Sequence, residues 1–272
     1  MDRLENCLED VKFCAYLVGN LVIKAFYNQS KNVTHKSVVD LVTDTDKEVE
    51  QSIINYLQSK YPNYKILAEE SVTDLVLDDN PTWIIDPIDG TTNFTRGIPL
   101  ISICIGLVIN KEPVLGVVYN PILNELYSAI KNKGAFLNDY PIKVSTNDCI
   151  SKAIINTNVG YDRSVESVNN ILSNMKQMLS LNVQAIRSTG SAAVDMCWVA
   201  TGKIDSYYEF GIQSWDIAAA TVIVREAGGI VTLANGNPLN LLARSVLASN
   251  NQLHKKIVPL ITVPTKFINT HS

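Results

Sequence analysis

The chain has 272 residues, of which 46% are hydrophobic and 18% are charged, and its formal net charge is -4 at pH 7. This composition is typical of a globular protein with a sizeable core, and it excludes a disordered or fibrous chain. The slight excess of acidic residues argues against a basic surface for nucleic acid or for anionic lipid. Chemistry on a small molecule is therefore the leading class of function.

Neither a membrane span nor a secretory leader is expected. The longest apolar run, Ile101–Ile109, has nine residues, whereas a membrane-spanning helix needs about 20. The N-terminus has no basic segment followed by an apolar one and a cleavage site. Five cysteines are scattered along the chain, a pattern that suits reduced thiols and a cytoplasmic protein better than a disulfide framework or a zinc site.

The first segment predicts two helices. Apolar residues recur every three or four positions from Leu4 to Phe26, which indicates a long amphipathic helix. A second helix is expected to begin near Thr45, where Thr45 and Glu48 match a capping box, and to end at Tyr61, before a proline.

Two short buried strands follow, and each ends in carboxylates. The strand expected at Tyr64–Ala68 is followed by Glu69 and Glu70, and the strand expected at Thr82–Asp86 contains its own terminal acid. Acids at the ends of apolar strands are the first indication of a functional site.

The rest of the chain changes from strands to alternating elements. Residues 101–144 read as an antiparallel meander, because β-rich runs are separated by turn signals. Beyond residue 149 strands and helices alternate, with strands near 153–157, 183–187 and 204–210 and helices near 165–181, 190–201 and 214–227. No linker or internal repeat is visible. We therefore expect an α+β fold and one two-lobed domain over 1–272, with lobes of about 1–145 and 146–272.

The motif D-P-x-D-G-T at residues 86–91 carries the most information in the chain. Pro87 has a fixed φ and biases Asp86 toward an extended conformation, so Asp86 and Asp89 can converge on one point. Gly90 permits a tight turn, after which the backbone N–H groups of Gly90 and Thr91 can face an anion. Taken alone, the motif is equally consistent with an ordinary surface turn.

Further acids make a cation site more plausible. Glu69 and Glu70 end one strand, Glu209 ends another, and Asp216 begins a helix. Each has a simpler interpretation, such as a solvated loop or a helix N-terminal charge. Together, hard oxygen ligands without accompanying His or Cys favour Mg²⁺ over zinc or copper.

Several longer motifs resemble the Mg²⁺-dependent, lithium-sensitive inositol monophosphatase family, close to its animal-type enzymes. The segments LAEES, WIIDPIDGTTNF and WDIAAATVIVREAGG carry the resemblance, and GVVYNP, KGAFLND, IRSTGSAAVDMCWVATG and DSYYEF follow in matching order over roughly residues 36–250. The resemblance implies a layered αβαβα sandwich and a homodimer. It also implies Mg²⁺-dependent hydrolysis of myo-inositol monophosphates to inositol and phosphate by a metal-activated water, in line and without a covalent intermediate.

The resemblance assigns metal ligands residue by residue. Glu69, Asp86 and the Ile88 carbonyl would bind one Mg²⁺, and Asp86, Asp89 and Asp216 a second. A third ion, held mostly by water, would lie near Glu69. Two to three ions per site are thus expected, together with inhibition by Li⁺.

Catalytic and substrate-binding roles follow by the same route. Glu69, Thr91 and Asp46 would act on the attacking water, and Glu70 and Lys36 would support the site from outside the first ligand layer. The substrate contacts would come from Asp89, Gly90, Thr91, Gly190, Ser191, Ala192, Glu209 and Asp216.

Two alternatives stay open. One is a sibling phosphatase acting on a nucleotide or sugar phosphate, which the T-N-F ending of the motif and the lack of insertions disfavour. The other is a catalytically silent scaffold protein, which the intact ligand set disfavours. Neither nucleic acid nor a membrane is an expected partner.

Overall fold

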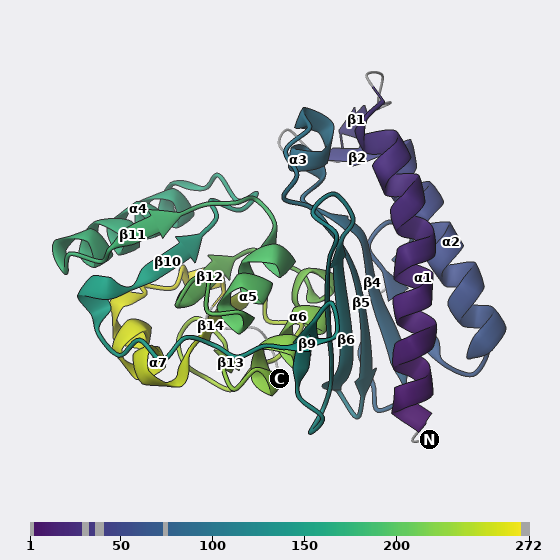
Figure 1. Cartoon of the computed structure of the whole chain (residues 1–272). Coiled ribbons are helices and arrows are strands. Elements are labelled where there is room, and N and C mark those ends of the chain that lie inside the picture. Colours follow the sequence, from purple (N-terminus) through teal and green to yellow (C-terminus); the bar gives the residue numbers. More distant parts are fainter. Residues whose placement is uncertain (1–2, 29–32, 36–40, 73–75, 268–272) are drawn as a thin grey trace.

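The computed structural model describes residues 3–28, 33–35, 41–72 and 76–267, and two sheets dominate it (Figure 1). The larger, seven-stranded sheet has the strand order β3-β4-β5-β6-β7-β8-β9. Its strands are β3 (Lys65–Ala68), β4 (Thr82–Asp89), β5 (Ser102–Ile109), β6 (Glu112–Asn120), β7 (Glu125–Ile130), β8 (Ala135–Leu137) and β9 (Tyr140–Pro141). Among the described strands of this sheet, β3 and β4 alone pair in parallel, so the antiparallel meander predicted for residues 101–144 is confirmed.

Helices α1 (Arg3–Phe26) and α2 (Asp44–Lys60) cover the outer face of this sheet (Figure 1). The predicted apolar stripe of α1 faces the core: Cys7 and Cys14 are buried, and others such as Leu4 and Leu8 are half-buried. A small sheet of β1 (Val33–His35) and β2 (Leu41–Thr43) leads into α2. No helix in the described ranges is both long and apolar enough to cross a membrane.

The capping box predicted for α2 is two residues out of place. Thr43, not Thr45, is the N-cap, and its reciprocal partner is Asp46, not Glu48. The two patterns overlap in the sequence, and the pairing of β2 ends the extended chain at Thr43, which fixes where the helix begins.

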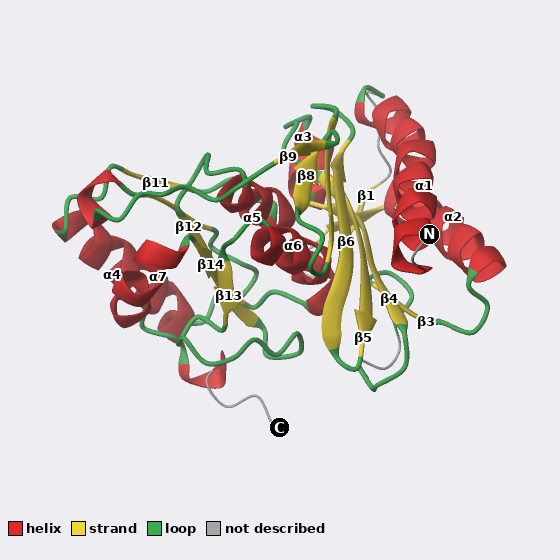
Figure 2. Ribbon diagram, turned by 60° about the horizontal axis from the view of Figure 1, so that its bottom comes forward, coloured by secondary structure: helices red, strands yellow, loops and turns green. Residues whose placement is uncertain are grey.

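Helices α5 (Ala192–Ala200) and α6 (Ser214–Glu226) lie against the inner face of the large sheet (Figure 2). Glycines in the strands let α6 approach closely: a Cβ placed on Gly116 would lie 2.1 Å from the Ala219 carbonyl oxygen, and one on Gly106 would lie 3.0 Å from the Ala219 nitrogen. This contact fixes where the N-terminus of α6 lies.

The five-stranded sheet closes the other side of α5 and α6, with the order β11-β10-β12-β14-β13. Its strands are β10 (Ile154–Thr157), β11 (Ala185–Arg187), β12 (Ser206–Phe210), β13 (Ile230–Thr232) and β14 (Ser245–Ser249). Helices α4 (Val165–Ser180) and α7 (Asn251–Ile257) cover its outer face. The remaining helices are α3 (Thr91–Arg96) and three 3₁₀ turns, at Ile150–Lys152, Val258–Leu260 and Thr265–Phe267.

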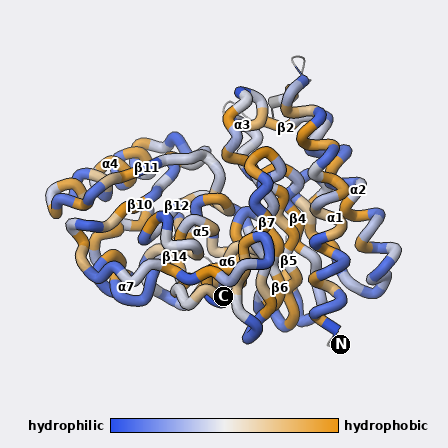
Figure 3. Tube along the Cα trace, viewed as in Figure 1, coloured by the Kyte–Doolittle hydropathy of each residue, from blue (hydrophilic) through white to orange (hydrophobic). Residues whose placement is uncertain are grey.

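Successive side chains of the five-stranded sheet point to its opposite faces and pack against different helix layers. Tyr207 packs in the cluster that contains α5 and α6, whereas Tyr208 packs with α4 and α7. Apolar residues accordingly gather along the strands and inner helices (Figure 3). The order of layers is helices, sheet, helices, sheet, helices, which confirms the predicted α+β, αβαβα sandwich. The five cysteines are all free, as the scattered positions indicated.

Candidate active site

The D-P-x-D-G motif lies on a bulged end of β4. Every residue from Thr82 to Asp89 is buried. Asp86 pairs with Cys104 of β5 but Asp89 pairs with Ser102, so β4 holds one extra residue between the two pairs. A bulge shifts the alternation of side chains. It therefore brings Asp86 and Asp89 to the same side of the strand, although they are three residues apart.

The chain turns at Gly90 into the short helix α3. Gly90 has φ of 90°, and a Cβ there would lie 3.0 Å from the Leu100 carbonyl oxygen, so a side chain is disfavoured on both counts. Thr91 begins α3, and its hydroxyl donates toward Asp46 Oδ1 at 3.2 Å or the Ile88 carbonyl at 3.1 Å. Gly90 and Thr91 thus place two backbone N–H groups beside the acids of β4.

Asp46 is the buried partner of this turn. Its carboxylate is fully buried and accepts the Thr43 N–H at 2.9 Å as well as hydrogen bonds from the hydroxyls of Thr43 and Thr91. Burial raises the pKa of Asp46, although the hydrogen bonds from Thr43 and Thr91 oppose the shift. Helix α2 and helix α3 are thereby joined through one side chain.

Asp89 connects the large sheet to α5. It accepts from the Ser191 hydroxyl at 2.5 Å and from the N–H groups of Ala192 and Ala193 at 3.3 and 2.8 Å. Burial raises the pKa of Asp89, and these donors oppose that shift. These contacts therefore bring residues 190–192 to the acid cluster. The Ser191 hydroxyl and the Ala192 N–H each donate a hydrogen bond to Asp89.

Asp216 and Glu209 come from the second half of the chain. Asp216 accepts the Gln213 N–H at 2.7 Å at the start of α6. Glu209, at 8% exposure, accepts from the Tyr207 hydroxyl and from Asn158 Nδ2, the latter at 2.9 Å. Burial raises the pKa of Glu209 to about 7.

Four acids act on one another at the centre of the site. Burial, followed by the charges of Glu69, Asp89 and Asp216, raises the pKa of Asp86 well above its usual range. Burial also raises the pKa of Asp216, with the charges of Asp89 and Glu69 adding to it. Asp86 Oδ1 is buried and has no hydrogen-bond partner in the described structure. Such repulsion and such an orphaned oxygen are what a bound cation relieves.

The acids do not form a ready-made cage. Among the described residues, no group of three His, Cys, Asp or Glu side chains converges as metal ligands would. The four carboxylates nevertheless lie close enough for the charges of Glu69, Asp89 and Asp216 to act on Asp86. Mg²⁺ characteristically keeps several waters and takes only one or two protein carboxylates. The donor set therefore fits Mg²⁺ with water completing its coordination.

The predicted residues Glu69 and Glu70 follow the end of β3. Glu69 follows β3 and donates its N–H to the Ile85 carbonyl at 3.1 Å, while the Glu70 N–H donates to Glu50 Oε2 at 2.7 Å. Lys36 lies outside the described residues.

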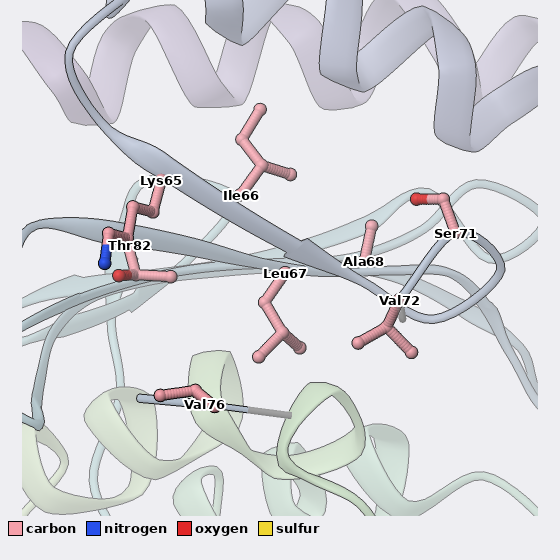
Figure 4. Close-up of a pocket in the computed structure, with 8 residues that line it drawn as sticks. All are labelled: Lys65, Ile66, Leu67, Ala68, Ser71, Val72, Val76 and Thr82. Atoms are coloured by element: carbon pink, nitrogen blue, oxygen red, sulfur yellow. The ribbon is translucent and has the colours of Figure 1, made fainter. Parts of the chain in front are cut away.

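A pocket of about 310 Å³ lies beside the edge strand β3 (Figure 4). Leu67 and Val76 lie on opposite sides of it, and Ser71 and Val72 are at one end. No acid of the cluster lines it. This pocket is therefore separate from the acid cluster.

Two buried residues near Glu209, Asn158 and Asp195, were not predicted from the sequence. Asn158 contacts Glu209, and Asp195 contacts both Asn156 and Asn158. Asn158 directly follows the strand β10, just as Glu69 directly follows β3 and Glu209 lies near the end of β12. This position after a buried strand is the sequence feature that could have indicated Asn158 as a site residue.

The family model described as "Inositol monophosphatase family" matches residues 4–263 of the chain. The chain belongs to the inositol monophosphatase family. An inositol monophosphatase of Dictyostelium discoideum is 47% identical over 246 residues, covering 90% of each chain. Human inositol monophosphatase 1 is 43% identical over 255 residues, covering 93% of this chain and 92% of the human one.

The fold comparison agrees with the inositol monophosphatase family. The solved structure of inositol monophosphatase from Anabaena (Nostoc) sp. PCC 7120 is 32% identical, with a TM-score of 0.86, and the match covers 97% of this chain and 99% of that one. The prediction of a phosphoric monoester hydrolase is confirmed by membership of this family.

Proposed function

We propose that this enzyme hydrolyses myo-inositol monophosphates to inositol and phosphate and requires Mg²⁺. The names of its relatives support the substrate class. The observation that carries the metal requirement is Asp86, whose buried Oδ1 has no partner and whose neighbours are acids. A cation is the group that best compensates this arrangement.

The proposed metal ligands are those that the family resemblance implies. Glu69, Asp86 and the Ile88 carbonyl would hold one ion, and Asp86, Asp89 and Asp216 would hold another. A third would lie near Glu69, mostly on water. When bound, Mg²⁺ ions supply an activated water and stabilise charge on the phosphoryl and leaving oxygens. Asp86 belongs to both principal sets, and its loss should do the greatest harm.

The protein's own groups orient the reactants. We propose that the Thr91 hydroxyl, held by Asp46, accepts a hydrogen bond from the attacking water, with Glu69 beside it. The N–H groups of Gly90 and Thr91 hold the phosphate, because they open α3 beside the acids. Attack by water in line with the leaving oxygen needs no covalent intermediate.

The polyol is held by Asp89 of β4 and by residues from the second half of the chain. Glu209, Asp216 and Asp89 accept hydrogen bonds from ring hydroxyls. Residues 190–192 border the same site at the N-terminus of α5, held there by hydrogen bonds to Asn158, Thr189 and Asp89. Specificity for a hydroxylated leaving group then rests mainly on Glu209, which comes from β12 and is neither a proposed metal ligand nor part of the phosphate-binding turn.

Further properties are proposed from family membership. They are inhibition by Li⁺, supporting roles for Glu70 and Lys36, a homodimer and a cytoplasmic location. Lithium, a small hard cation, would replace the more weakly held Mg²⁺.

The experiment compares phosphate release from inositol 1-phosphate, adenosine 3′,5′-bisphosphate and fructose 1,6-bisphosphate, each in Mg²⁺ and in EDTA. We expect metal-dependent turnover that is greatest on inositol 1-phosphate. Greatest turnover on either other substrate would favour a sibling specificity. No turnover by folded, Mg²⁺-bound protein on any of the three would favour the scaffold reading.

A further inference from the structure

A buried amide lies directly behind the proposed polyol-binding carboxylate. Asn158 follows β10 and is 8% exposed. Its Nδ2 donates to Glu209 Oε2 at 2.9 Å and to Asp195 Oδ2 at 3.1 Å. Both amide protons of Asn158 therefore point at carboxylates, one on β12 and one on α5.

The other end of the same amide holds a loop. Asn158 Oδ1 accepts from the Ser188 hydroxyl at 3.0 Å and from the N–H groups of Thr189 and Gly190 at 3.1 and 3.0 Å. With acceptors only at Nδ2 and donors only at Oδ1, the orientation of the amide is fixed. The loop that it holds leads into the N-terminus of α5.

Glu209 is left with one oxygen for a ligand. The bonds from Asn158 and from the Tyr207 hydroxyl both end on Oε2. Within the described structure no hydrogen bond reaches Oε1, and this oxygen is not among the buried atoms that lack a partner. Asn158 and Tyr207 thus hold the carboxylate by Oε2 and leave Oε1 available to accept a further hydrogen bond.

Asp195 anchors the amide from the side away from the substrate. It is fully buried on α5 and also accepts from Asn156 Nδ2 at 2.6 Å. Charge-assisted bonds of this kind are strong and directional in a buried setting.

We propose that Asn158 is a positioning residue for substrate specificity: anchored by Asp195, it sets Glu209 and the loop at 188–190 to receive the hydroxyl groups of a polyol phosphate. This inference rests on the proposed function, because Glu209 is its polyol contact. It adds a determinant of the leaving-group end of the substrate that no sequence motif marks.

The first test compares wild-type enzyme and Asn158→Asp at pH 8 in Mg²⁺. Substrates are inositol 1-phosphate and p-nitrophenyl phosphate, whose ring carries no hydroxyl group. The variant replaces a donor by a like charge, so the ratio of the two kcat/KM values should fall about tenfold, mainly through KM for inositol 1-phosphate. An unchanged ratio overturns the proposal.

A double variant separates positioning from stability. Asn158→Asp with Asp195→Asn restores an amide–carboxylate pair between positions 158 and 195, but it leaves Glu209 facing an acid. We expect the Tm lost in the single variant to return while the ratio stays low. A ratio that recovers together with Tm would show that Asn158 is merely structural.

The final arm asks whether Asn158 acts through Glu209. In a Glu209→Gln background, adding Asn158→Asp should change the ratio by less than about twofold, since the contact that it positions is already altered. A full tenfold loss in that background contradicts the proposal. If wild-type enzyme fails to hydrolyse inositol 1-phosphate at all, the proposed function fails instead.

Discussion

Asp86 shows how function and stability oppose each other at a single residue. Its carboxylate is 1% exposed and surrounded by Glu69, Asp89 and Asp216, which together with burial raise its pKa. A site of this kind is unfavourable for the metal-free protein and useful only when a cation is bound.

Replacing Asp86 with Asn should therefore stabilise the metal-free protein. In EDTA we expect Asp86→Asn to raise Tm by about 2–4 °C, the shift that about 1 kcal/mol gives in a chain of this size. The increase in Tm on adding Mg²⁺ should shrink. Differential scanning fluorimetry with and without Mg²⁺ checks both, and a lower Tm in EDTA would contradict the account.

Asp195 predicts how stability depends on pH. Burial raises its pKa to about 7, from 3.8. Between about pH 4 and pH 7 the folded protein keeps a proton that the unfolded chain has released, so the free energy of unfolding falls as pH rises. In Asp195→Asn this part of the fall should be absent. Urea midpoints in EDTA at pH 5 and pH 8 measure it, and an equal decrease in both proteins would refute the prediction.

For single residues, the sequence indicated the acids of the site but not the buried polar residues that hold them in place. Asp86 and Asp89 lie within one motif whose proline and glycine constrain the backbone. Asn158 and Asp195 are 37 residues apart, and only the pairing of β10 and the start of α5 bring them together. No local pattern marks such a pair.

Among the secondary-structure elements, α6 packs closely on the large sheet because two glycines beneath it have no side chains. Gly106 and Gly116 lie on neighbouring strands beneath Ala219, so the helix that carries Asp216 rests almost on the sheet backbone. Hydrophobic periodicity predicted most helices and strands, because that pattern is local. Helix α7 and strands β1, β2, β13 and β14 were not predicted, because they are short and depend on neighbouring elements.

Adding one methyl group to the sheet beneath α6 should strongly destabilise the protein. We expect Gly116→Ala to lower the free energy of unfolding by about 3 kcal/mol, and Gly106→Ala by less, because their Cβ atoms would lie 2.1 and 3.0 Å from Ala219. Urea denaturation of both variants gives the ordering. Equal effects, or no effect at Gly116, would show that α6 can shift without loss.

For the whole molecule, the central core is shared by both halves of the chain. One cluster contains Ile84 and Val118 from the large sheet together with Tyr207 and Val246 from the small one, packed around α5 and α6. The acids are likewise divided, with Asp86 on one side and Asp216 on the other. The prediction of one two-lobed domain therefore has a physical consequence.

Unfolding should occur in a single cooperative transition. A shared core cannot lose one half without exposing apolar surface of the other. We expect urea transitions followed by tryptophan fluorescence and by far-UV circular dichroism to coincide. Two separated transitions would mean that the lobes are independent domains.

The most direct test of the central claim is the initial rate of phosphate release from inositol 1-phosphate across a range of Mg²⁺ concentrations, for wild-type enzyme beside Asp86→Asn. We expect saturable activation of the wild-type enzyme, no activity in EDTA, and a loss of activity of about 100-fold or more in Asp86→Asn. Turnover that is independent of Mg²⁺, or retained in Asp86→Asn, would contradict it.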